Sequence, residues 1–386
     1  MKEAVIIDAI RSPFGKYNGV LADVHPVDLL ADVLKGLVER TGINPSEVDD
    51  IIGGCVHQHA EQGLNVTRNA WLAAGFPESV PAATIDRQCG SSLQAAHFAA
   101  QGVMAGAYDM VIACGVDSKT RVKADGSSRE NSAWVPRLEE RYPIDEPWFV
   151  PIKSADYIAK KWGFTRDNLD EYAFRSQHLA SRAENERILE KQIIPITKRN
   201  GEVVKFDEGI RHDTKLEKVK SLNPVLPQLG VEMITAANSS QVTDGASAVL
   251  IMSADKAKEL GLKPRARFVN FSAVGSDVME WLTGPAPATQ KVLKRAGLTV
   301  DDIDVFEVNE AFASVVLVWQ KEIGAPMEKV NINGGAIAVG HPPGATGGRL
   351  ICATLAALEQ RNGRYGLIAI CEGGAMANAT IIERLP

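Results

Sequence analysis

The sequence predicts an α/β protein built from two similar halves. Short apolar segments rich in β-branched residues alternate with segments of helical character along the 386 residues. This pattern is typical of a mostly parallel sheet that is covered by helices on both faces. In addition, several strand and helix segments of the first half recur in the second half at a nearly constant spacing, which indicates an internal duplication. Together these observations predict one strand–helix plan that is used twice, with the two copies packed together.

The chain opens on a predicted strand. MKEAVIIDAI carries an apolar run almost from its first residue, and it lacks the basic segment, apolar core and small-residue cleavage site of a secretory signal. No apolar stretch approaches the roughly 20 residues that are needed to cross a bilayer. We therefore expect a buried first strand and a cytoplasmic protein without a membrane span.

The duplication is clearest where a helix gives way to a strand. ERTGINPSEVDDI (39–51) aligns with KRAGLTVDDIDVF (294–306), and Gly42 falls on Gly297. Each copy predicts a helix ended by glycine, a short capped turn and a strand. Three further pairs of predicted strands extend the match: AVIIDAI with ARFVNFSA, AYDMVIACG with RYGLIAICE, and ASAVLIMSA with NATIIER.

Residues from about 119 to 240 have no counterpart in the second half, so they are predicted to form an insertion. The insertion begins with the polar stretch KTRVKADGSSRENSAW and continues through the proline-rich RYPIDEPWFVPIK. It then predicts two helices, SADYIAKKW and TRDNLDEYAFRSQHLASRAENERILEKQ, with Thr165 as the N-cap of the second. An excursion of this length between matched strands predicts a cap over a site.

These boundaries give the expected domains. Residues 1–257 form the predicted N-terminal domain, which carries the inserted loop domain, and residues 264–386 form the C-terminal domain. With 45% hydrophobic and 23% charged residues, the chain has enough apolar side chains for two or three domain cores.

Charge and cysteine usage exclude several classes of protein. The 42 Lys and Arg residues against 48 Asp and Glu residues give a net charge of −6, which argues against a general binder of nucleic acid or anionic membranes. The five cysteines are odd in number, lie far apart and form no CxxC motif, so neither a disulfide framework nor a zinc site is predicted. The pair His57 and His59 has no visible third ligand, and we expect no metal site.

Cys89 is the first candidate for chemistry. In IDRQCGSSLQ (85–94) a predicted strand leads into Cys89 and a predicted helix begins directly after it. The positive end of a helix stabilises a thiolate and lowers the pKa of a thiol from its usual value of about 8.5. This position favours a nucleophile, although a buried structural cysteine is an equally good interpretation of the stretch alone.

Three other glycine-rich or polar stretches carry reactive side chains. His341 lies in GHPPG, where the glycines allow a close approach of the backbone to a ligand. Cys371 is followed by Glu372 and two glycines, whereas Cys114, its partner in the duplication, ends an apolar strand and is interpreted as a core residue. Asn309 follows the predicted strand VFEV, where it serves either as a helix cap or as an active-site group at a strand end.

Taken together, these motifs make the chain resemble the thiolases, a family of acetyl-CoA acyltransferases, over nearly all of its length. The resemblance implies that Cys89 is the acylated nucleophile, that His341 in GHP is its base, and that Cys371 in CxGG is a second acid and base. It implies that Asn309 in NEAF assists an oxyanion. It also implies a duplicated fold in which two αβα halves pack as a five-layer αβαβα core.

The resemblance implies two oxyanion sites and a mode of coenzyme A binding. One oxyanion site would use His341 with a water held by Asn309, and the other the backbone N–H groups of Cys89 and Gly373. Coenzyme A would be a co-substrate beneath the inserted domain, with no permanently bound cofactor. The residues that match coenzyme A contacts, or add charge beside them, are Ser240, Arg211 and Lys218, with Lys215 nearby; for the lysines a solvated surface is an equally good interpretation.

The sequence departs from the common family pattern at positions that bear on the substrate. CGVDSKT places Lys119 where a methionine is common, and PIKSADYIA places Pro151 and Ile152 where Met-Gly often lines the acyl pocket. Glu372 beside Cys371 is expected to raise the pKa of that thiol. These departures favour a reshaped acyl pocket.

The expected function is therefore that of a degradative 3-ketoacyl-CoA thiolase acting on fatty or related acyl chains. Its partners are acyl-CoA and coenzyme A, and the family resemblance implies a homodimer or homotetramer. One alternative is an acetoacetyl-CoA thiolase that works in the condensing direction with the same catalytic residues. Another, from a different class, is a non-catalytic protein that binds coenzyme A or lipid on the same fold.

Overall fold

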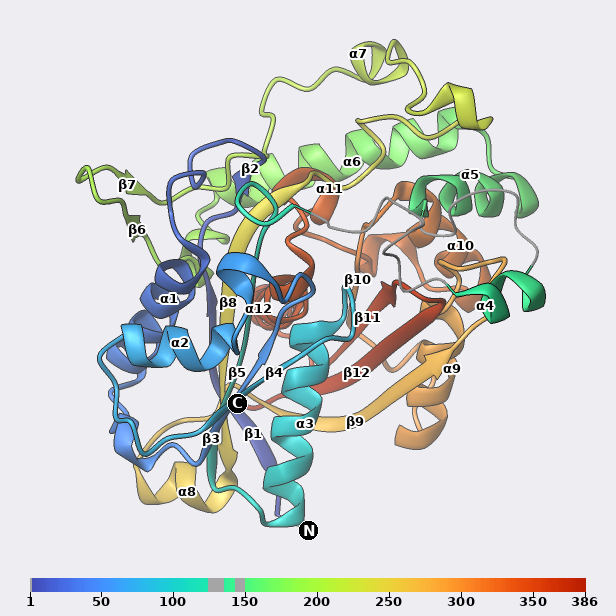
Figure 1. Ribbon diagram of the computed structural model, residues 1–386. Coiled ribbons are helices and arrows are strands. Elements are labelled where there is room, and N and C mark those ends of the chain that lie inside the picture. Colours follow the sequence, from blue (N-terminus) through green and yellow to red (C-terminus); the bar gives the residue numbers. More distant parts are fainter. Residues whose placement is uncertain (1, 124–134, 143–149) are drawn as a thin grey trace.

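The computed structural model describes residues 2–123, 135–142 and 150–386 (Figure 1). Most of the polar stretch KTRVKADGSSRENSAW, and the centre of the proline-rich stretch that follows it, lie outside the described residues. Among the described residues, none of the helices is long and apolar enough to span a bilayer.

In the described part of the chain, ten strands form one mixed sheet whose order is symmetric about its centre. The order is β4-β3-β5-β8-β1-β9-β12-β11-β10, with β2 beside β8. The strands are β1 (Ala4–Arg11), β2 (Gly15–Lys16), β3 (Asp50–Gly54), β4 (Ala82–Ile85), β5 (Met110–Ser118), β8 (Thr243–Ser253), β9 (Ala266–Gly275), β10 (Val305–Val308), β11 (Tyr365–Glu372) and β12 (Met376–Arg384). The halves meet where β1 pairs with β9 through only two residues, Val5 and Ile6.

The predicted duplication is confirmed by these positions. The matched pairs β1 and β9, β8 and β12, β5 and β11, and β3 and β10 take equivalent places on either side of the centre. The helix before β3 ends at Gly42 with φ +68° and the helix before β10 ends at Gly297 with φ +67°, a left-handed backbone that glycine adopts without steric cost.

The expectation of a mostly parallel sheet is wrong. Among the strands that the structure describes, only β3 with β4, β3 with β5, and β10 with β11 pair in parallel, and the other strand pairs are antiparallel. The reason is visible at the C-terminus, where β12 follows β11 after only Gly373, Gly374 and Ala375. Gly374 and Ala375 have positive φ angles, so the chain reverses at once and the two strands must be antiparallel.

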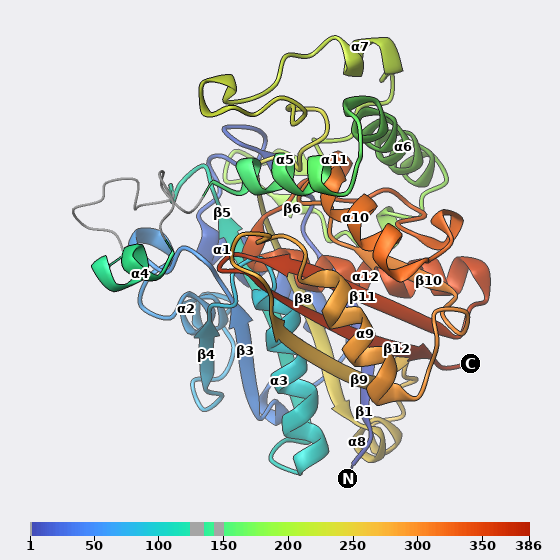
Figure 2. The same cartoon turned by 90° about the vertical axis from the view of Figure 1, so that its right-hand side faces the viewer.

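Helices and half-sheets alternate in five layers. The helices are α1 (Pro26–Thr41), α2 (Val66–Ala73), α3 (Ser91–Ala105), α8 (Ala254–Glu259), α9 (Pro285–Ala296), α10 (Ala313–Ile323), α11 (Ala336–Val339) and α12 (Pro343–Arg361). Helices α3 and α12 pack against each other between the half-sheets, α1 and α2 cover the outer face of one half, and α9 and α10 cover that of the other (Figures 1 and 2). The predicted α/β class and layer order are confirmed.

The insertion contributes α4 (Pro136–Arg141), α5 (Pro151–Lys161), α6 (Arg166–Asn185), α7 (Leu216–Lys220) and the hairpin of β6 (Ile196–Thr197) and β7 (Val203–Val204). Thr165 is the N-cap of α6, as predicted: its hydroxyl accepts from the Asn168 backbone, and the Asn168 side chain accepts from the Thr165 backbone. Helices α5 and α6 pack on α10, and Figure 2 shows α5, α6 and α7 together over one end of the layers.

Candidate active site

A cavity of about 310 Å³ brings together the reactive residues that the sequence singled out. Cys89 directly precedes α3, His341 precedes α12, and Cys371 lies at the end of β11, and all three line the cavity. Each half contributes one helix to the central layer, α3 from the first half and α12 from the second. Cys89 and His341 therefore lie at the amino ends of equivalent helices. Gly373 and Ser240 line the same cavity.

The turn that carries Cys89 is held by local hydrogen bonds. Gln88 adopts a left-handed backbone with φ +50°, an unusual conformation for a residue with a side chain. The Ser91 hydroxyl donates to the Gln88 carbonyl at 2.6 Å and accepts from the Arg87 backbone N–H at 2.9 Å. This turn ends the approach from β4 and presents Cys89 at the start of α3.

The expected lowering of the Cys89 pKa is wrong. Burial raises the pKa of the Cys89 thiol to about 12, with a smaller opposing effect from the charge of Lys119 and a further increase from Glu372. Desolvation of the thiolate outweighs the amino end of the helix because the sulfur is surrounded by protein. The thiol is therefore protonated at neutral pH and needs a base.

His341 has the properties of that base. Its Nδ1 lies 2.7 Å from the Thr346 hydroxyl, which itself donates to the Pro342 carbonyl at 2.8 Å. Since the hydroxyl proton is already used, the hydroxyl accepts from His341, which places the imidazole proton on Nδ1 and leaves Nε2 as an acceptor. Burial, with the charges of Arg349 and Lys119, lowers the pKa of His341 to about 3, so the ring is neutral.

Cys371 is a protonated neighbour of Cys89. It is buried, and its pKa is raised well above the usual value by burial, by the adjacent Cys89 sulfur and by Glu372. A Cβ at Gly373 would lie 2.6 Å from Gln88 Oε1, so the Gln88 side chain packs closely against this glycine. The backbone after Cys371 thus comes close to the turn that carries Cys89.

The two polar residues after β10, Asn309 and Glu310, differ in their hydrogen bonding. Glu310 is fully engaged: it accepts from the hydroxyls of Tyr172 and Ser176 and from the Ile337 backbone, which ties β10 to α6 and α11. Asn309 is fully buried and, among the described residues, neither atom of its amide group has a hydrogen-bond partner. It does not itself line the cavity, so any role in catalysis would require an intermediary.

The predicted coenzyme A residues lie in two adjoining cavities. Arg211 and Lys218 line a second cavity of about 450 Å³ beneath α7, with Lys215 on its wall, whereas Ser240 lines the first cavity. Gln241 borders both cavities and so marks their junction. The three cations form no ion pair with the described residues, which leaves their charges available to an anionic ligand.

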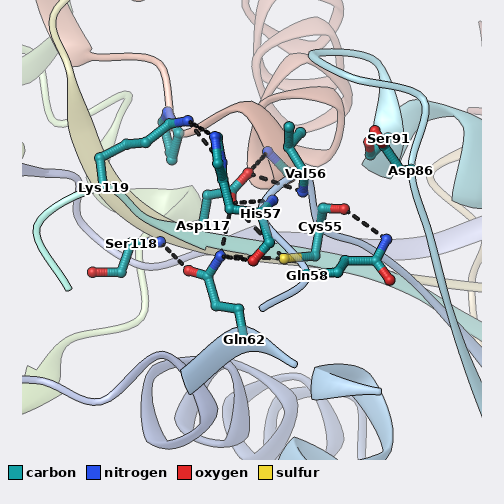
Figure 3. Close-up of polar contacts among 12 residues, drawn as sticks. Cys55, Val56, His57, Gln58, Gln62, Asp86, Ser91, Asp117, Ser118 and Lys119 are labelled. Atoms are coloured by element: carbon teal, nitrogen blue, oxygen red, sulfur yellow. Dashed lines mark hydrogen bonds and ion pairs between the residues drawn. The ribbon is translucent and has the colours of Figure 1, made fainter. Parts of the chain in front are cut away.

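A buried polar cluster at the cavity wall escaped the sequence analysis (Figure 3). The Asp117 carboxylate accepts from the Gly344 backbone at 2.5 Å and from Gln62 at 3.0 Å, and it lies 3.6 Å from the His57 ring. Although burial acts against the charged form, His57 and Lys119 hold the pKa of Asp117 below its usual value. Because Gly344 follows His341 closely, this cluster fixes the loop that carries His341. Among the described residues, no group of three or more His, Cys, Asp or Glu side chains could hold a metal ion.

Comparison with known proteins gives one consistent result. Two family models match, described as "Thiolase, N-terminal domain" over residues 4–255 and "Thiolase, C-terminal domain" over residues 262–384. The steroid 3-ketoacyl-CoA thiolase FadA6 of Mycobacterium tuberculosis is 44% identical over 100% of this chain and 95% of its own length. A 3-ketoacyl-CoA thiolase of Bacillus subtilis is 40% identical over 99% of this chain and its full length. The crystal structure of the Bacillus anthracis acetyl-CoA acetyltransferase superposes with a TM-score of 0.91 at 36% identity, covering 100% of this chain and 99% of that one.

Proposed function

Because the chain belongs to the thiolase family of acyltransferases, we propose that it is a 3-ketoacyl-CoA thiolase. It cleaves a 3-ketoacyl-CoA with coenzyme A into acetyl-CoA and an acyl-CoA that is two carbons shorter. The observation that carries this proposal is the meeting of Cys89, His341 and Cys371 at one cavity that adjoins a second, cationic one.

The first half-reaction starts from a protonated Cys89 thiol and a neutral His341 ring, the protonation states that burial favours. His341 Nε2 takes the proton of Cys89, and the thiolate attacks the C3 keto carbon of the substrate. The C2–C3 bond then breaks, its electron pair passes to the enolate of acetyl-CoA, and Cys371 donates its proton to C2 of that enolate. The products are acetyl-CoA, an acyl thioester on Cys89 and a Cys371 thiolate.

The second half-reaction restores the enzyme. The Cys371 thiolate removes the proton of the incoming coenzyme A thiol, and the coenzyme A sulfur attacks the acyl carbonyl on Cys89. Cys89 leaves as a thiolate and regains its proton from His341. The raised pKa of Cys371 suits it to be reprotonated in this step.

We assign the two oxyanions to different donors. The protonated Nε2 of His341, with a water bound by the unpartnered amide of Asn309, faces one of them. The backbone N–H groups of Cys89 and Gly373 face the other, consistent with the close approach of Gly373 to the Cys89 turn. Preorganised donors of this kind contribute a few kcal/mol to lowering a barrier.

We assign coenzyme A to the two adjoining cavities. Arg211 and Lys218, with Lys215, would face its phosphates, and Ser240 would lie beside the pantetheine arm as it enters the first cavity. The family resemblance supports a homodimer or homotetramer in the cytoplasm as the working form.

The lining of the first cavity favours acyl chains other than acetoacetyl. Lys119 and Pro151, two of the departures from the common family pattern, both line the cavity, whereas Ile152 packs against the apolar core of the C-terminal half. A second candidate function is that of an acetoacetyl-CoA thiolase working in the condensing direction, and the close superposition on an acetyl-CoA acetyltransferase favours it.

Thiolysis across chain lengths tests the proposal. Purified enzyme is given coenzyme A and 3-ketoacyl-CoAs of four to twelve carbons, and the release of acetyl-CoA is measured by chromatography. We expect cleavage of chains longer than acetoacetyl, and no cleavage by a Cys89→Ala variant whose circular dichroism matches the wild type. Activity confined to acetoacetyl-CoA would instead support the condensing enzyme, and an active Cys89→Ala variant would overturn the mechanism.

A further inference from the structure

Lys119 brings a positive charge into the cavity that holds the reactive cysteines. It follows directly after β5 and lines the same cavity as Cys89 and His341. The backbone of the next residue, Thr120, donates to the Asp244 carboxylate at 2.9 Å, which fixes the turn. The position of Lys119 is therefore set by the sheet and its first turn.

The contacts of Lys119 hold it in place without a direct ion pair. Its Nζ lies 2.8 Å from His57 Nδ1 and 3.1 Å from His57 Nε2, and among the described residues it forms no ion pair (Figure 3). Other lysines of the chain pair with carboxylates, for example Lys160 with Asp156 at 2.8 Å and Lys256 with Glu47 at 2.9 Å.

The carboxylate of Asp117, which lies beside His57, is already engaged. It accepts from the Gly344 backbone and from Gln62, and the His57 ring stands beside it. His57 thus links a saturated buried carboxylate to a lysine whose remaining donors are available. An ammonium group has three donors, and His57 uses only part of that capacity.

The surroundings of Lys119 favour a further anion that makes direct contact with it. Much of the cavity wall is apolar, including Val56, Pro151, Val242, Leu282 and Phe312. A cation in such a setting is stabilised strongly by an anion that enters beside it. Lys119 and Cys89 line the same cavity, and the charge of Lys119 is the main effect opposing the rise that burial causes in the pKa of Cys89.

Of the groups that the substrate brings, the acyl part is the one that can offer Lys119 an anion. The phosphates of coenzyme A have their own cations, Arg211, Lys215 and Lys218, in the second cavity. The pantetheine arm that joins the phosphates to the thioester carries no charge. Within the substrate, the acyl chain bound at Cys89 is the part that can carry a permanent anionic group into the first cavity.

We propose that Lys119, oriented by His57, binds an acidic group on the acyl chain, so that the preferred substrates are 3-ketoacyl-CoAs whose acyl chain carries a carboxylate. This inference rests on the proposed function and specifies its substrate class. The common methionine at this position would offer no such partner, and the lysine converts an apolar wall into an anion-binding one.

Matched substrates test the inference. The value of kcat/KM is measured for 3-ketoadipyl-CoA against 3-ketohexanoyl-CoA, and for 3-ketosuberyl-CoA against 3-ketooctanoyl-CoA, pairs that differ only in the terminal carboxylate. We expect the wild type to prefer the acidic member of at least one pair. Loss of a hydrogen bond to a charged group corresponds to a change of about ten- to a hundredfold, so Lys119→Met should lower the acidic-to-neutral ratio by that factor. Lys119→Arg should keep most of the preference, and Lys258→Met, an exposed lysine on α8, is the matched control.

The ratio separates the possible outcomes. A wild-type ratio at or below one in both pairs, or a ratio that Lys119→Met leaves unchanged, overturns the inference. Equal losses on both members of a pair would mean that Lys119 acts on the Cys89 thiolate and does not select the acyl chain. A wild type that cleaves neutral chains without preference contradicts this inference alone, whereas one that cleaves no 3-ketoacyl-CoA contradicts the proposed function as well.

Discussion

Glu372 predicts an unusual dependence of stability on pH. This residue ends β11 beside Cys371, is fully buried, and has no hydrogen-bond partner for either carboxyl oxygen among the described residues. Its carboxyl group is packed against Gly90, where a Cβ would lie 2.0 Å from Oε1. Burial raises the pKa of Glu372 from 4.5 to about 9, against an opposing effect of Arg87.

The sign and size of the effect follow from this raised pKa. Between pH 4.5 and about 9 the folded protein keeps the Glu372 proton while the unfolded chain loses it, so the free energy of unfolding falls as pH rises. Each pH unit in this window corresponds to about 1.4 kcal/mol, which gives about 3 kcal/mol between pH 5 and pH 7. Glu372→Gln keeps the shape of the side chain and removes its titration.

Urea unfolding at pH 5, 6 and 7, followed by tryptophan fluorescence, measures this effect. The difference in free energy of unfolding, Glu372→Gln minus wild type, should increase by about 3 kcal/mol from pH 5 to pH 7. Other titrating groups are common to both proteins and cancel in the difference. A difference that stays constant with pH, or that shrinks as pH rises, would refute a neutral buried Glu372.

Three other residues give predictions that separate catalysis, binding and stability. Thr346→Val leaves Nδ1–H of His341 without its acceptor and should lower kcat/KM for thiolysis about ten- to a hundredfold, while Thr346→Ser retains activity; equal activities of the two variants would contradict the assigned role. Arg211→Met should raise the KM for coenzyme A several-fold with a smaller change in kcat, and an unchanged KM in steady-state kinetics would remove Arg211 from the binding site. Asp207→Asn breaks the buried two-point ion pair with Arg11 and should cost about 3–5 kcal/mol in urea unfolding, whereas a loss below 1 kcal/mol would show that the pair is dispensable.

The features that depend on short stretches of sequence could be predicted. Gly42 and Gly297 end their helices and Thr165 begins one because caps depend on a few adjacent residues. The duplication could be found because strand and helix patterns recur in order. Whether strands run parallel or antiparallel could not be predicted, since this depends on how distant segments pair. Only the short turn between β11 and β12 gave local evidence of antiparallel pairing.

In the candidate site, too, residues marked by short motifs could be predicted, and contacts made by folding could not. Cys89, His341 and Cys371 stood out because each follows or precedes a glycine-rich turn, and the structure brings all three to one cavity. The raised pKa of Cys89 could not be predicted, because it depends on groups that only folding brings close to the sulfur. The contact of Lys119 with His57 could not be predicted either, because it forms after β3 and β5 have paired. The Thr346 hydroxyl, five residues after His341 on the first turn of α12, was the one supporting group whose sequence position offered a clue.

The identity of the acylated residue tests the central claim most directly. Enzyme mixed briefly with a 3-ketoacyl-CoA and quenched in acid, without added coenzyme A, is digested and analysed by mass spectrometry. The proposed mechanism predicts an acyl group, two carbons shorter than the substrate chain, on the peptide that contains Cys89, and no label in Cys89→Ala. An acyl group on Cys371 in place of Cys89 would exchange the two roles and contradict the account.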